Sequence, residues 1–442
     1  MKTKKYTIMT FGCQMNEHDS EKIAAILERM GYEKITNYEE SDFIIYNTCL
    51  VRENAELKVY GQIGALKKWK KENPNAILAI CGCMMQTGEA RSVIIEKYPQ
   101  VDLIFGTSNI NKIPELIDQY KRTGKTVVDI NRTDSIDDQF DMIRSHPSIG
   151  YINIMTGCNN FCSYCIVPYA RGREKSRFYE SILDEARKLA DEGYKEIILL
   201  GQNVNSYGND LESSITFPEL LKKINEIEKI SRIRFLTSHP KDLSDELIDA
   251  MTNLDKVCEY LHLPFQSGST RILKEMNRKY TKEDYLELIR KLKNKVPNIT
   301  LSTDIIVGFP GETEEDFLET LDLVRKIEFE QAFTFLYSIR PGTKAAKMEE
   351  QVPQEVKQER FNRLLDTLYP IFYDKNKNYL GKEVELLVES KSKNSDSMMS
   401  GRTRGYKLVH FKGDEKLIGK MVKVKINDFN SFALKGELIE EG

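Results

Sequence analysis

The sequence predicts an α/β protein of several domains: an N-terminal α/β domain with a parallel sheet, an open (βα)6 partial TIM barrel and a small C-terminal β-barrel. Strand-like and helical segments alternate up to about residue 121, which predicts a parallel sheet. The alternation resumes near residue 150 and repeats six times, whereas residues 377–440 read as short strands separated by turns. A chain of 442 residues has room for about three such domains.

The N-terminal domain is predicted at 3–121, and three of its strand-like segments end in a cysteine: Cys13, Cys49 and Cys83. Ligands of parallel sheets gather at the carboxyl ends of the strands, so we expect these three cysteines to converge at one edge. The alternative for any one of them is a buried apolar residue, which is how we interpret Cys81.

The middle domain is predicted at 144–374, after a polar linker at 131–139. Active sites of TIM-like barrels lie at the carboxyl ends of the strands, which directs attention to the residues that follow each one. The predicted strands are 151–155, 196–200, 233–237, 260–264, 299–307 and 332–337.

A cysteine loop follows the first barrel strand, with Cys158, Cys162 and Cys165 in C-x3-C-x2-C spacing. A 4Fe-4S cluster usually takes four thiolates, so three close cysteines leave one iron open for a substrate. Zinc or a disulfide is the alternative, but a zinc site needs further Cys or His ligands, and the nearest histidine, His146, lies upstream of the strand. We therefore interpret the loop as an iron-sulfur site for chemistry.

A run of basic residues follows this loop, namely Arg171, Arg173, Lys175 and Arg177. It has two interpretations: contact with nucleic-acid phosphates or a solvated charged face. Two histidines in the barrel, His239 and His262, are interpreted as core or supporting residues without a catalytic role.

The C-terminal domain is predicted at 377–440 as a small closed β-barrel, an architecture often used for RNA. One of its strands interleaves cations with aromatic residues, which suits phosphate contact and base stacking, although a solvated surface strand is the alternative. The candidate RNA-binding residues are Arg402, Arg404, Tyr406, Lys407 and Phe411.

Composition is compatible with this interpretation. The net charge of −3 is nearly neutral and neither requires nor excludes nucleic acid. Eight cysteines are too few for a disulfide scaffold in 442 residues, and exposed thiolate clusters need a reducing compartment. No apolar run approaches membrane-spanning length, so we expect a cytoplasmic protein without membrane contact.

The cysteine loop and the residues up to Arg177 resemble the radical S-adenosylmethionine (SAM) enzymes. Further matches at Phe11–Asn16, Asn47–Glu53 and Thr156–Glu174 narrow the resemblance to the methylthiotransferases, and within them to those that modify N6-(dimethylallyl)adenosine in tRNA. The last domain resembles the TRAM domain, a small RNA-binding module. Together these resemblances cover almost the whole chain.

The resemblance implies two 4Fe-4S clusters and SAM as cofactors. The loop cysteines would hold the cluster whose open iron binds SAM and from which a 5'-deoxyadenosyl radical is generated. Cys13, Cys49 and Cys83 would hold an auxiliary cluster that carries sulfur, to which another SAM donates a methyl group. Methylthiolation at C2 of the adenosine next to the anticodon is the implied reaction, with two SAM molecules used.

The resemblance also suggests SAM contacts. The segment Gly201, Gln202 and Asn203 stands where many radical SAM enzymes have Gly-Gly-Glu, so a neutral amide replaces the carboxylate here. For the ribose hydroxyls or the methionyl group the candidates are Gln266, Ser267 and Asp304, and for packing on the adenine the candidate is Tyr164.

The implied partners are a tRNA anticodon stem-loop and an electron donor of the flavodoxin or ferredoxin type. Three alternatives stay open: methylthiolation of threonylcarbamoyl-adenosine in tRNA, methylthiolation of an aspartate in a small-subunit ribosomal protein, and a non-catalytic iron-sulfur module that binds RNA. The complete cysteine motifs weigh against the last, and the basic, aromatic third domain weighs against the second.

Overall fold

The computed structural model describes residues 3–50, 53–132, 142–212, 215–392 and 395–441. The chain forms two compact units: residues 1–145, 156–159 and 165–177 make the first, and the remainder makes the second. Each unit has hydrophobic clusters of its own. Most of the predicted linker at 131–139, and Arg52 of the motif around Cys49, lie outside the described residues.

The first unit contains a six-stranded parallel sheet in the order β2-β1-β3-β4-β5-β6. The predicted parallel sheet is thus confirmed. Its strands are β1 (Lys4–Thr10), β2 (Tyr32–Lys34), β3 (Phe43–Thr48), β4 (Ile77–Gly82), β5 (Leu103–Phe105) and β6 (Val127–Asp129).

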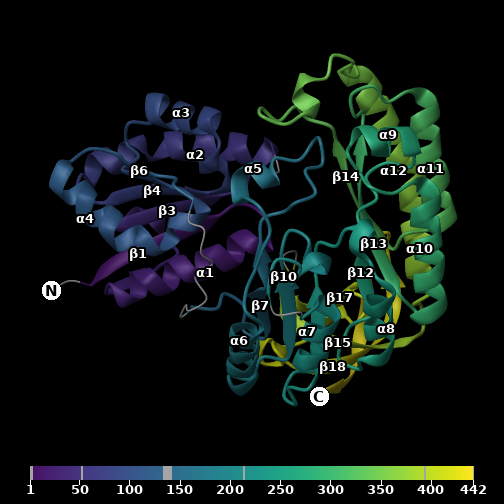
Figure 1. Ribbon diagram of the computed structural model, residues 1–442. Coiled ribbons are helices and arrows are strands. Elements are labelled where there is room, and N and C mark those ends of the chain that lie inside the picture. Colours follow the sequence, from purple (N-terminus) through teal and green to yellow (C-terminus); the bar gives the residue numbers. More distant parts are fainter. Residues whose placement is uncertain (1–2, 51–52, 133–141, 213–214, 393–394, 442) are drawn as a thin grey trace. The chain divides into compact units, whose positions relative to one another are not determined.

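Helices cover both faces of this sheet, as Figure 1 shows. Because β3 and β4 are covered on both sides, every residue in them is buried, and they read as apolar runs rather than as alternating strands. One face carries α1 (Gln14–Arg29) and α4 (Ile113–Thr123), and the other carries α2 (Glu53–Glu72) and α3 (Gly88–Lys97).

The second unit contains the six predicted βα strands, arranged as two parallel three-stranded sheets in the orders β11-β10-β7 and β12-β13-β14. A parallel bridge joins Ile233 of β11 to Val257, which lies just before β12. The open (βα)6 barrel is therefore confirmed. Its strands are β7 (Ile149–Asn153), β10 (Glu196–Leu200), β11 (Arg232–Phe235), β12 (Tyr260–His262), β13 (Thr300–Val307) and β14 (Gln331–Leu336).

Amphipathic helices cover the outer face of the barrel strands, with α10 and α11 beside β12 and β13 in Figure 1. Thr281 and Thr313 start α10 and α11 with capping boxes, which satisfy the first backbone N–H groups of each helix. The barrel helices are α6 (Tyr179–Asp191), α7 (Phe217–Asn225), α8 (Asp245–Asn253), α9 (Thr270–Glu275), α10 (Lys282–Lys295), α11 (Glu314–Ile327) and α12 (Gln354–Lys377).

Alternation along the strands separates two faces of the barrel. Leu261, Leu301 and Ile305 belong to the core that the helices share, so their face is the outer one. His262 and Asp304, which alternate with them, lie on the inner face, where their side chains are 3.4 Å apart.

The predicted C-terminal barrel is confirmed as a closed five-stranded barrel in the order β15-β16-β17-β19-β18. Leu386, Val388, Val409, Phe411 and Val424 fill its interior. The strands are β15 (Glu383–Ser392), β16 (Ser395–Thr403), β17 (Leu408–Lys412), β18 (Met421–Phe429) and β19 (Leu434–Glu441).

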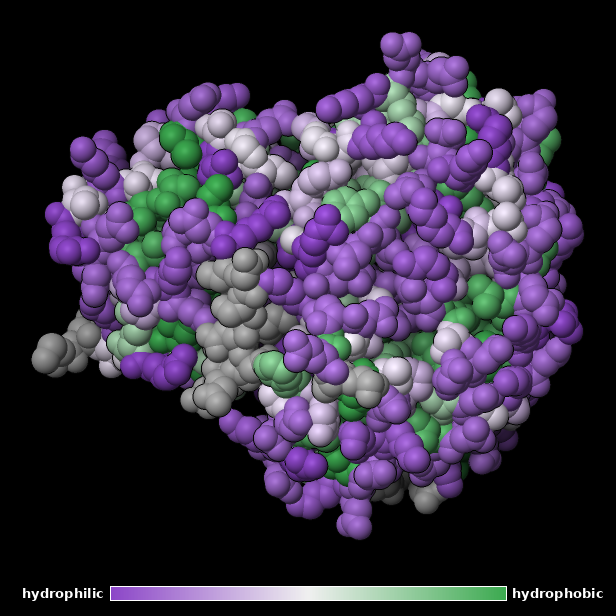
Figure 2. All heavy atoms as spheres, viewed as in Figure 1, coloured by the Kyte–Doolittle hydropathy of each residue, from purple (hydrophilic) through white to green (hydrophobic). Residues whose placement is uncertain are grey.

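The face seen in Figure 2 is mainly hydrophilic, with hydrophobic residues in separate patches. Among the helices of the described residues, none combines the length and the apolar character that a lipid bilayer would require of a spanning segment.

Candidate functional site

The sheet-edge triad consists of Cys13, Cys49 and Cys83. Cys13 follows β1, Cys49 follows β3 and Cys83 follows β4, which are neighbours in the sheet. In a sheet whose order begins β2-β1-β3, the direction of winding reverses between β1 and β3, and such a switch point opens a crevice at the carboxyl ends of the strands. The topology therefore brings three cysteines that are distant in sequence to one crevice.

Glycines let the loops of this crevice approach one another. A Cβ on Gly12 would lie 2.8 Å from Cβ of Cys49, and a Cβ on Gly82 would lie 2.3 Å from the carbonyl oxygen of Thr48. Gly82 also has a φ of 95°, in the left-handed region that side chains disfavour. The residue before Cys13 and the residue before Cys83 are thus glycines because the neighbouring loop leaves no room for a side chain.

The thiols of the sheet-edge triad interact electrostatically. A hydrogen bond with the Cys49 side chain lowers the pKa of Cys13 to about 6, and the Arg171 guanidinium acts in the same direction. Burial raises the pKa of Cys83, although Arg171 opposes the shift. A thiolate is the form that binds iron, so this concentration of thiols beside a cation suits a metal cluster.

Arg171 belongs to the short helix α5 (Val167–Arg171), which directly follows the cysteine loop. Its Nε donates to Sγ of Cys83 at 3.2 Å, and its Nη2 donates to the Asp19 carboxylate at 2.9 Å. The side chain is 7% exposed. Neither predicted use of the basic run applies to Arg171, because it is neither solvated nor open to a phosphate.

The loop triad consists of Cys158, Cys162 and Cys165, between β8 (Met155–Thr156) and α5. Cys162 is buried and the other two are half-buried. The N–H of Cys158 donates to the carbonyl of Gly172 at 3.1 Å, and a Cβ on Gly157 would lie 2.0 Å from the Arg173 carbonyl oxygen. Backbone contacts with the segment before β9 (Lys175–Ser176) therefore fix the start of the loop.

Cys162 has its own buried arginine. Nη1 of Arg278 donates to Sγ of Cys162 at 3.5 Å, while its Nη2 donates to the Pro264 carbonyl at 2.7 Å and its Nε donates to the Tyr280 hydroxyl at 2.8 Å. The contact of Arg171 with a cysteine sulfur was not predicted from the sequence, and Arg278 was not among the predicted site residues. The position of Arg171, six residues after Cys165, is a sequence signal that could have indicated its role. Arg278 follows α9, and no motif surrounds it.

Within the part of the chain that the structure describes, no three Cys, His, Asp or Glu side chains converge closely enough to hold a single metal ion. The thiolates of a four-iron cluster bind separate irons and therefore lie farther apart than the ligands of one ion.

Strained backbone and unpaired polar atoms mark the carboxyl ends of the barrel strands. Thr237 and Gln266, which follow β11 and β12, have positive φ values of 72° and 69°. Non-glycine residues in this region cost free energy and often occur at ligand sites. Among the described residues, several buried polar atoms lack a hydrogen-bond partner, and those at this edge include Asn203 Oδ1, Ser238 Oγ and Gln266 Oε1.

These unpaired groups fit a polar ligand such as SAM, which brings amino, carboxylate and hydroxyl groups. Two of these unpaired oxygens belong to Asn203 and Gln266, which the sequence predicts as SAM contacts. The amide nitrogen of Asn203 is already engaged, because Nδ2 donates to Asp242 at 2.7 Å. Gly201 packs so closely that a Cβ would lie 2.6 Å from the Met155 side chain. Gln202 between them is half-buried.

The other predicted SAM contacts have structural partners. Ser267 is buried, and its hydroxyl accepts the N–H of Ser269 at 3.3 Å. Tyr164 packs against the apolar cluster that contains Met276 and Phe309. Gln266, in the turn after β12, lies beside Asp304 of β13, because its N–H donates to the Asp304 carbonyl at 2.9 Å.

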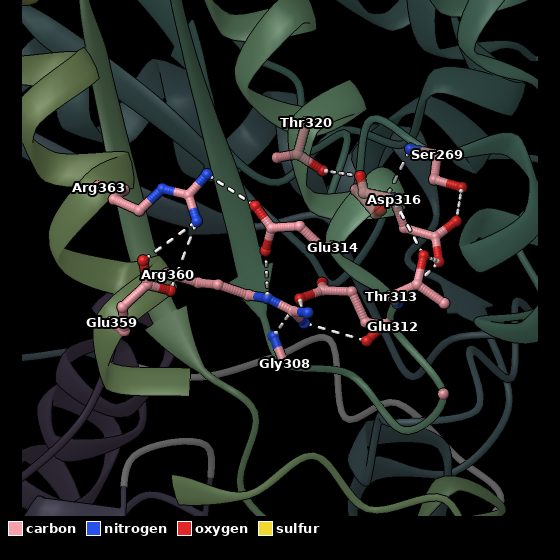
Figure 3. A network of polar contacts seen from close by, with 12 residues as sticks. Ser269, Gly308, Glu312, Thr313, Glu314, Asp316, Thr320, Glu359, Arg360 and Arg363 are labelled. Carbon is pink, nitrogen blue, oxygen red and sulfur yellow. Dashed lines mark hydrogen bonds and ion pairs between the residues drawn. The ribbon is translucent and has the colours of Figure 1, made fainter. Parts of the chain in front are cut away.

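A charged network secures the loop after β13, as Figure 3 shows. Glu312 accepts the Gly308 N–H at 3.0 Å and pairs with Arg360 of α12 at 2.9 Å. Asp316 accepts the Ser269 hydroxyl at 2.6 Å and so holds the turn after β12 against α11. Burial raises the pKa of Glu312 to about 7. The network thus fixes the loop after β13 and the turn after β12, and the turn contains the predicted SAM contacts Gln266 and Ser267.

The inner face of β14 leaves two aromatic rings exposed. Phe333 is 40% exposed and Phe335 is 37% exposed, on the alternate positions that pair with Asp304 and Ile306. The Phe333 ring lies edge-on to His262, with centroids 5.7 Å apart. This surface was not predicted from the sequence, because phenylalanines in a strand usually indicate a core.

The predicted RNA-binding residues lie elsewhere than expected. Phe411 is fully buried in the C-terminal barrel, which is incompatible with stacking of its ring on a base. Lys407 is buried, and its Nζ donates to Asn376 of α12 at 2.7 Å. Arg402 pairs with Glu389, and Arg404 pairs with Glu259 of the other barrel at 2.7 Å.

Tyr406 completes a joint between the two barrels. Its ring lies against Tyr260, at 4.7 Å between centroids, and between the guanidinium groups of Arg234 and Arg402 at 5.0 and 4.7 Å. Arg234 also donates to the carbonyl of Thr403 at 2.6 Å. These side chains close the amino-terminal end of the (βα)6 barrel, so RNA could reach them only by displacing contacts within the chain.

Three family models match the chain. The Radical SAM superfamily matches residues 152–324, the Uncharacterized protein family UPF0004 matches residues 5–106, and the TRAM domain matches residues 377–439.

Relatives named tRNA-2-methylthio-N(6)-dimethylallyladenosine synthase match almost the whole chain. The protein of that name from Finegoldia magna is 63% identical over 98% of this chain and 94% of its own length. The one from Alkaliphilus oremlandii is 58% identical over 100% of this chain and 94% of its own length.

Solved structures share the fold at low identity. A radical S-adenosylmethionine methyltransferase, TsrM, from Kitasatospora setae matches with a TM-score of 0.58 and 14% identity, over 78% of this chain and 77% of that chain. The cobalamin-dependent radical enzyme OxsB matches with a TM-score of 0.53 and 13% identity, over 83% and 55%.

Proposed function

This chain belongs to the tRNA-2-methylthio-N(6)-dimethylallyladenosine synthase family of radical SAM proteins, and we propose that it converts N6-(dimethylallyl)adenosine beside a tRNA anticodon to the 2-methylthio derivative. The observation that carries the proposal is the presence of both cysteine triads in a chain 63% identical to a protein of that name. A plain RNA-binding module would need neither triad.

The donor sets suit two iron-sulfur clusters. Cys158, Cys162 and Cys165 would hold one cluster together with SAM, and the sheet-edge triad would hold the other. When bound, these groups would supply the radical chemistry that removes the C2 hydrogen. They would also supply the methylthio group that takes the place of this hydrogen.

The barrel edge would orient SAM. We assign contacts with its polar groups to Gly201, Gln202 and Asn203 after β10 and to the turn after β12 that contains Gln266 and Ser267. The unpaired oxygens of Asn203 and Gln266 support this assignment, because a bound ligand with N–H or O–H donors would satisfy them. Asp304 would accept from hydroxyl groups, and Tyr164 would pack against the adenine.

The exposed rings of Phe333 and Phe335 would receive the substrate base. Enzymes that modify a base need it out of the stack, and the unpaired bases of an anticodon loop are accessible in this way. A flipped adenine can stack on a phenyl ring, and its dimethylallyl group adds apolar surface that the second ring can cover. His262 and Asp304 lie beside Phe333 and can contact the polar edge of the base.

The RNA grip would use the outward face of the C-terminal barrel. Lys412 and Lys435 are exposed on the paired strands β17 and β19, and Phe432, just before β19, is 66% exposed. Cations and an exposed ring on such a barrel suit phosphates and bases of a single-stranded loop. Electrons would come from a partner of the flavodoxin or ferredoxin type.

Nucleoside analysis tests the proposal. The protein, reconstituted with iron and sulfide under anaerobic conditions, is incubated with SAM, a reductant and an anticodon stem-loop that carries N6-(dimethylallyl)adenosine. Digestion and mass spectrometry should detect the 2-methylthio nucleoside. Matched reactions contain the stem-loop with threonylcarbamoyl-adenosine, the stem-loop with plain adenosine, or a small-subunit ribosomal protein. Product only in one of these matched reactions would overturn the proposal in favour of that substrate.

A further inference from the structure

Arg171 joins the segment after the loop triad to the sheet-edge triad. It lies six residues after Cys165, yet its Nε donates to Sγ of Cys83 at 3.2 Å. The helix that carries it packs on the same cysteine, because Ile166 and Ala170 form an apolar cluster with Leu50 and Cys83. The orientation of the Cys83 side chain is therefore fixed from two sides.

The second contact of Arg171 fixes the guanidinium. Nη2 donates to Asp19 of α1 at 2.9 Å, and the Arg171 and Asp19 side chains are 7% and 9% exposed. A guanidinium that is held in this way cannot turn toward water, and its charge acts on the sulfur with little screening by salt. An ion pair with a purely structural role would not need a donor directed at a cysteine.

We propose that Arg171 is a positioning residue of the sheet-edge triad, which holds Sγ of Cys83 and raises the reduction potential of the cluster bound there. The inference relies on the proposed function for the identity of that group as a 4Fe-4S cluster. Reduction adds negative charge to a cluster, and an N–H donor and a positive charge beside a ligand sulfur stabilise that charge.

Arg278 provides a matched comparison. It is also a buried arginine with one N–H directed at a cysteine sulfur, but that sulfur belongs to Cys162 of the loop triad. Replacing Arg278 should therefore affect the cluster of the loop triad and leave that of the sheet-edge triad unchanged.

The test uses the full chain with Cys158, Cys162 and Cys165 all replaced by alanine, so that one cluster remains. In this background we compare Arg171→Gln, Arg171→Lys, Asp19→Asn and Arg278→Lys. The measurements are the midpoint potential from a redox titration followed by electron paramagnetic resonance, and the rate at which a chelator removes iron. Circular dichroism checks that each variant is folded.

The Arg171→Gln variant should have a lower midpoint potential and lose iron about 10-fold faster or more. The Arg171→Lys variant keeps the charge and should recover part of the potential, Asp19→Asn should have a smaller effect than Arg171→Gln, and Arg278→Lys should have none. A folded Arg171→Gln variant with an unchanged potential would overturn the inference. An Arg278→Lys variant that shifts the midpoint potential as much as Arg171→Gln does would also overturn the inference.

These readouts do not depend on the RNA product. If the stem-loop assay fails while Arg171→Gln still shifts the potential, the proposed substrate is wrong and the role of Arg171 stands. If the background protein binds no cluster, the role of Arg171 fails together with the cluster assignment.

Discussion

One cysteine triad is assembled from the ends of three neighbouring sheet strands, whereas the other lies on a single loop after β8. The sheet-edge triad exists only when β1, β3 and β4 pair in order. The loop triad lies on one short segment, which is held by the bond from Cys158 to Gly172 and by bonds from Asn277 to the carbonyls of the loop. Yet in each triad one sulfur receives an N–H from a buried arginine. Sites built by different routes thus share a way of holding a sulfur.

The largest effect should come from removing one triad at a time. With Cys13, Cys49 and Cys83 replaced by alanine, the barrel loop remains intact, so the reduced protein should still cleave SAM to 5'-deoxyadenosine while making no methylthiolated nucleoside. With the loop triad replaced, both activities should disappear. Chromatography of the two products measures this, and loss of SAM cleavage in a folded sheet-edge variant would contradict the separation of roles.

Glycine substitutions should damage each triad selectively. Gly82→Ala places a Cβ against the Thr48 carbonyl, and Gly157→Ala places one against the Arg173 carbonyl, in both cases with a positive φ. We expect each change to cost about 1–3 kcal/mol locally and to remove most of the iron from its own triad only. The measurement is iron content per chain. Gly124→Ala is the matched control, because Gly124 also has a positive φ but has open space where the Cβ would lie.

The substrate face of the barrel should affect binding of RNA more than SAM chemistry. Phe333→Ala removes one exposed ring, and base–aromatic stacking contributes about 1–3 kcal/mol per base, so KM for the modified stem-loop should rise about 10-fold. Uncoupled SAM cleavage without RNA should stay at the wild-type rate. Leu318→Ala, an exposed apolar residue on α11, is the control. An unchanged KM for the Phe333 variant would remove this face from the substrate site.

The C-terminal barrel should give the smallest effects, of two distinguishable kinds. Arg404→Gln breaks the joint with Glu259 and should lower the free energy of unfolding by about 1–3 kcal/mol without changing the salt dependence of RNA binding. Replacing Lys412 and Lys435 by glutamine should leave the free energy of unfolding unchanged. It should reduce the salt dependence of RNA binding by about two counterions at most, because each phosphate contact that is lost leaves roughly one counterion on the RNA. If Arg404→Gln instead reduced the salt dependence of RNA binding and left stability unchanged, Arg404 would belong to the RNA-binding surface.

Patterns with a fixed period allowed prediction of the fold and of the convergence of the cysteines. Strand-helix alternation specifies a parallel sheet, and strand ends specify where Cys13, Cys49 and Cys83 meet. The RNA-binding residues could not be predicted in this way. Interleaved cations and aromatics describe an exposed RNA surface and a joint between two domains equally well, and Tyr406 and Arg402 belong to the joint.

Tertiary neighbours explain the other omissions. Arg278 is far from Cys162 in sequence, and only the packing of α9 against the cysteine loop brings them together. Phe333 and Phe335 alternate as a buried strand face would, but the barrel is open beside β14, and no described strand pairs with its other edge. An exposed aromatic face of this kind depends on a missing neighbour, which the sequence of the strand itself does not record.

Iron per chain is the most direct measurement of the claim that two separate triads each hold a cluster. After anaerobic reconstitution, the wild-type protein should contain about eight irons, and each triple-alanine variant should contain about four. Mössbauer spectra should assign the iron in all three proteins to 4Fe-4S clusters. A wild-type protein with about four irons, or a triple variant that retains all eight, would contradict the claim.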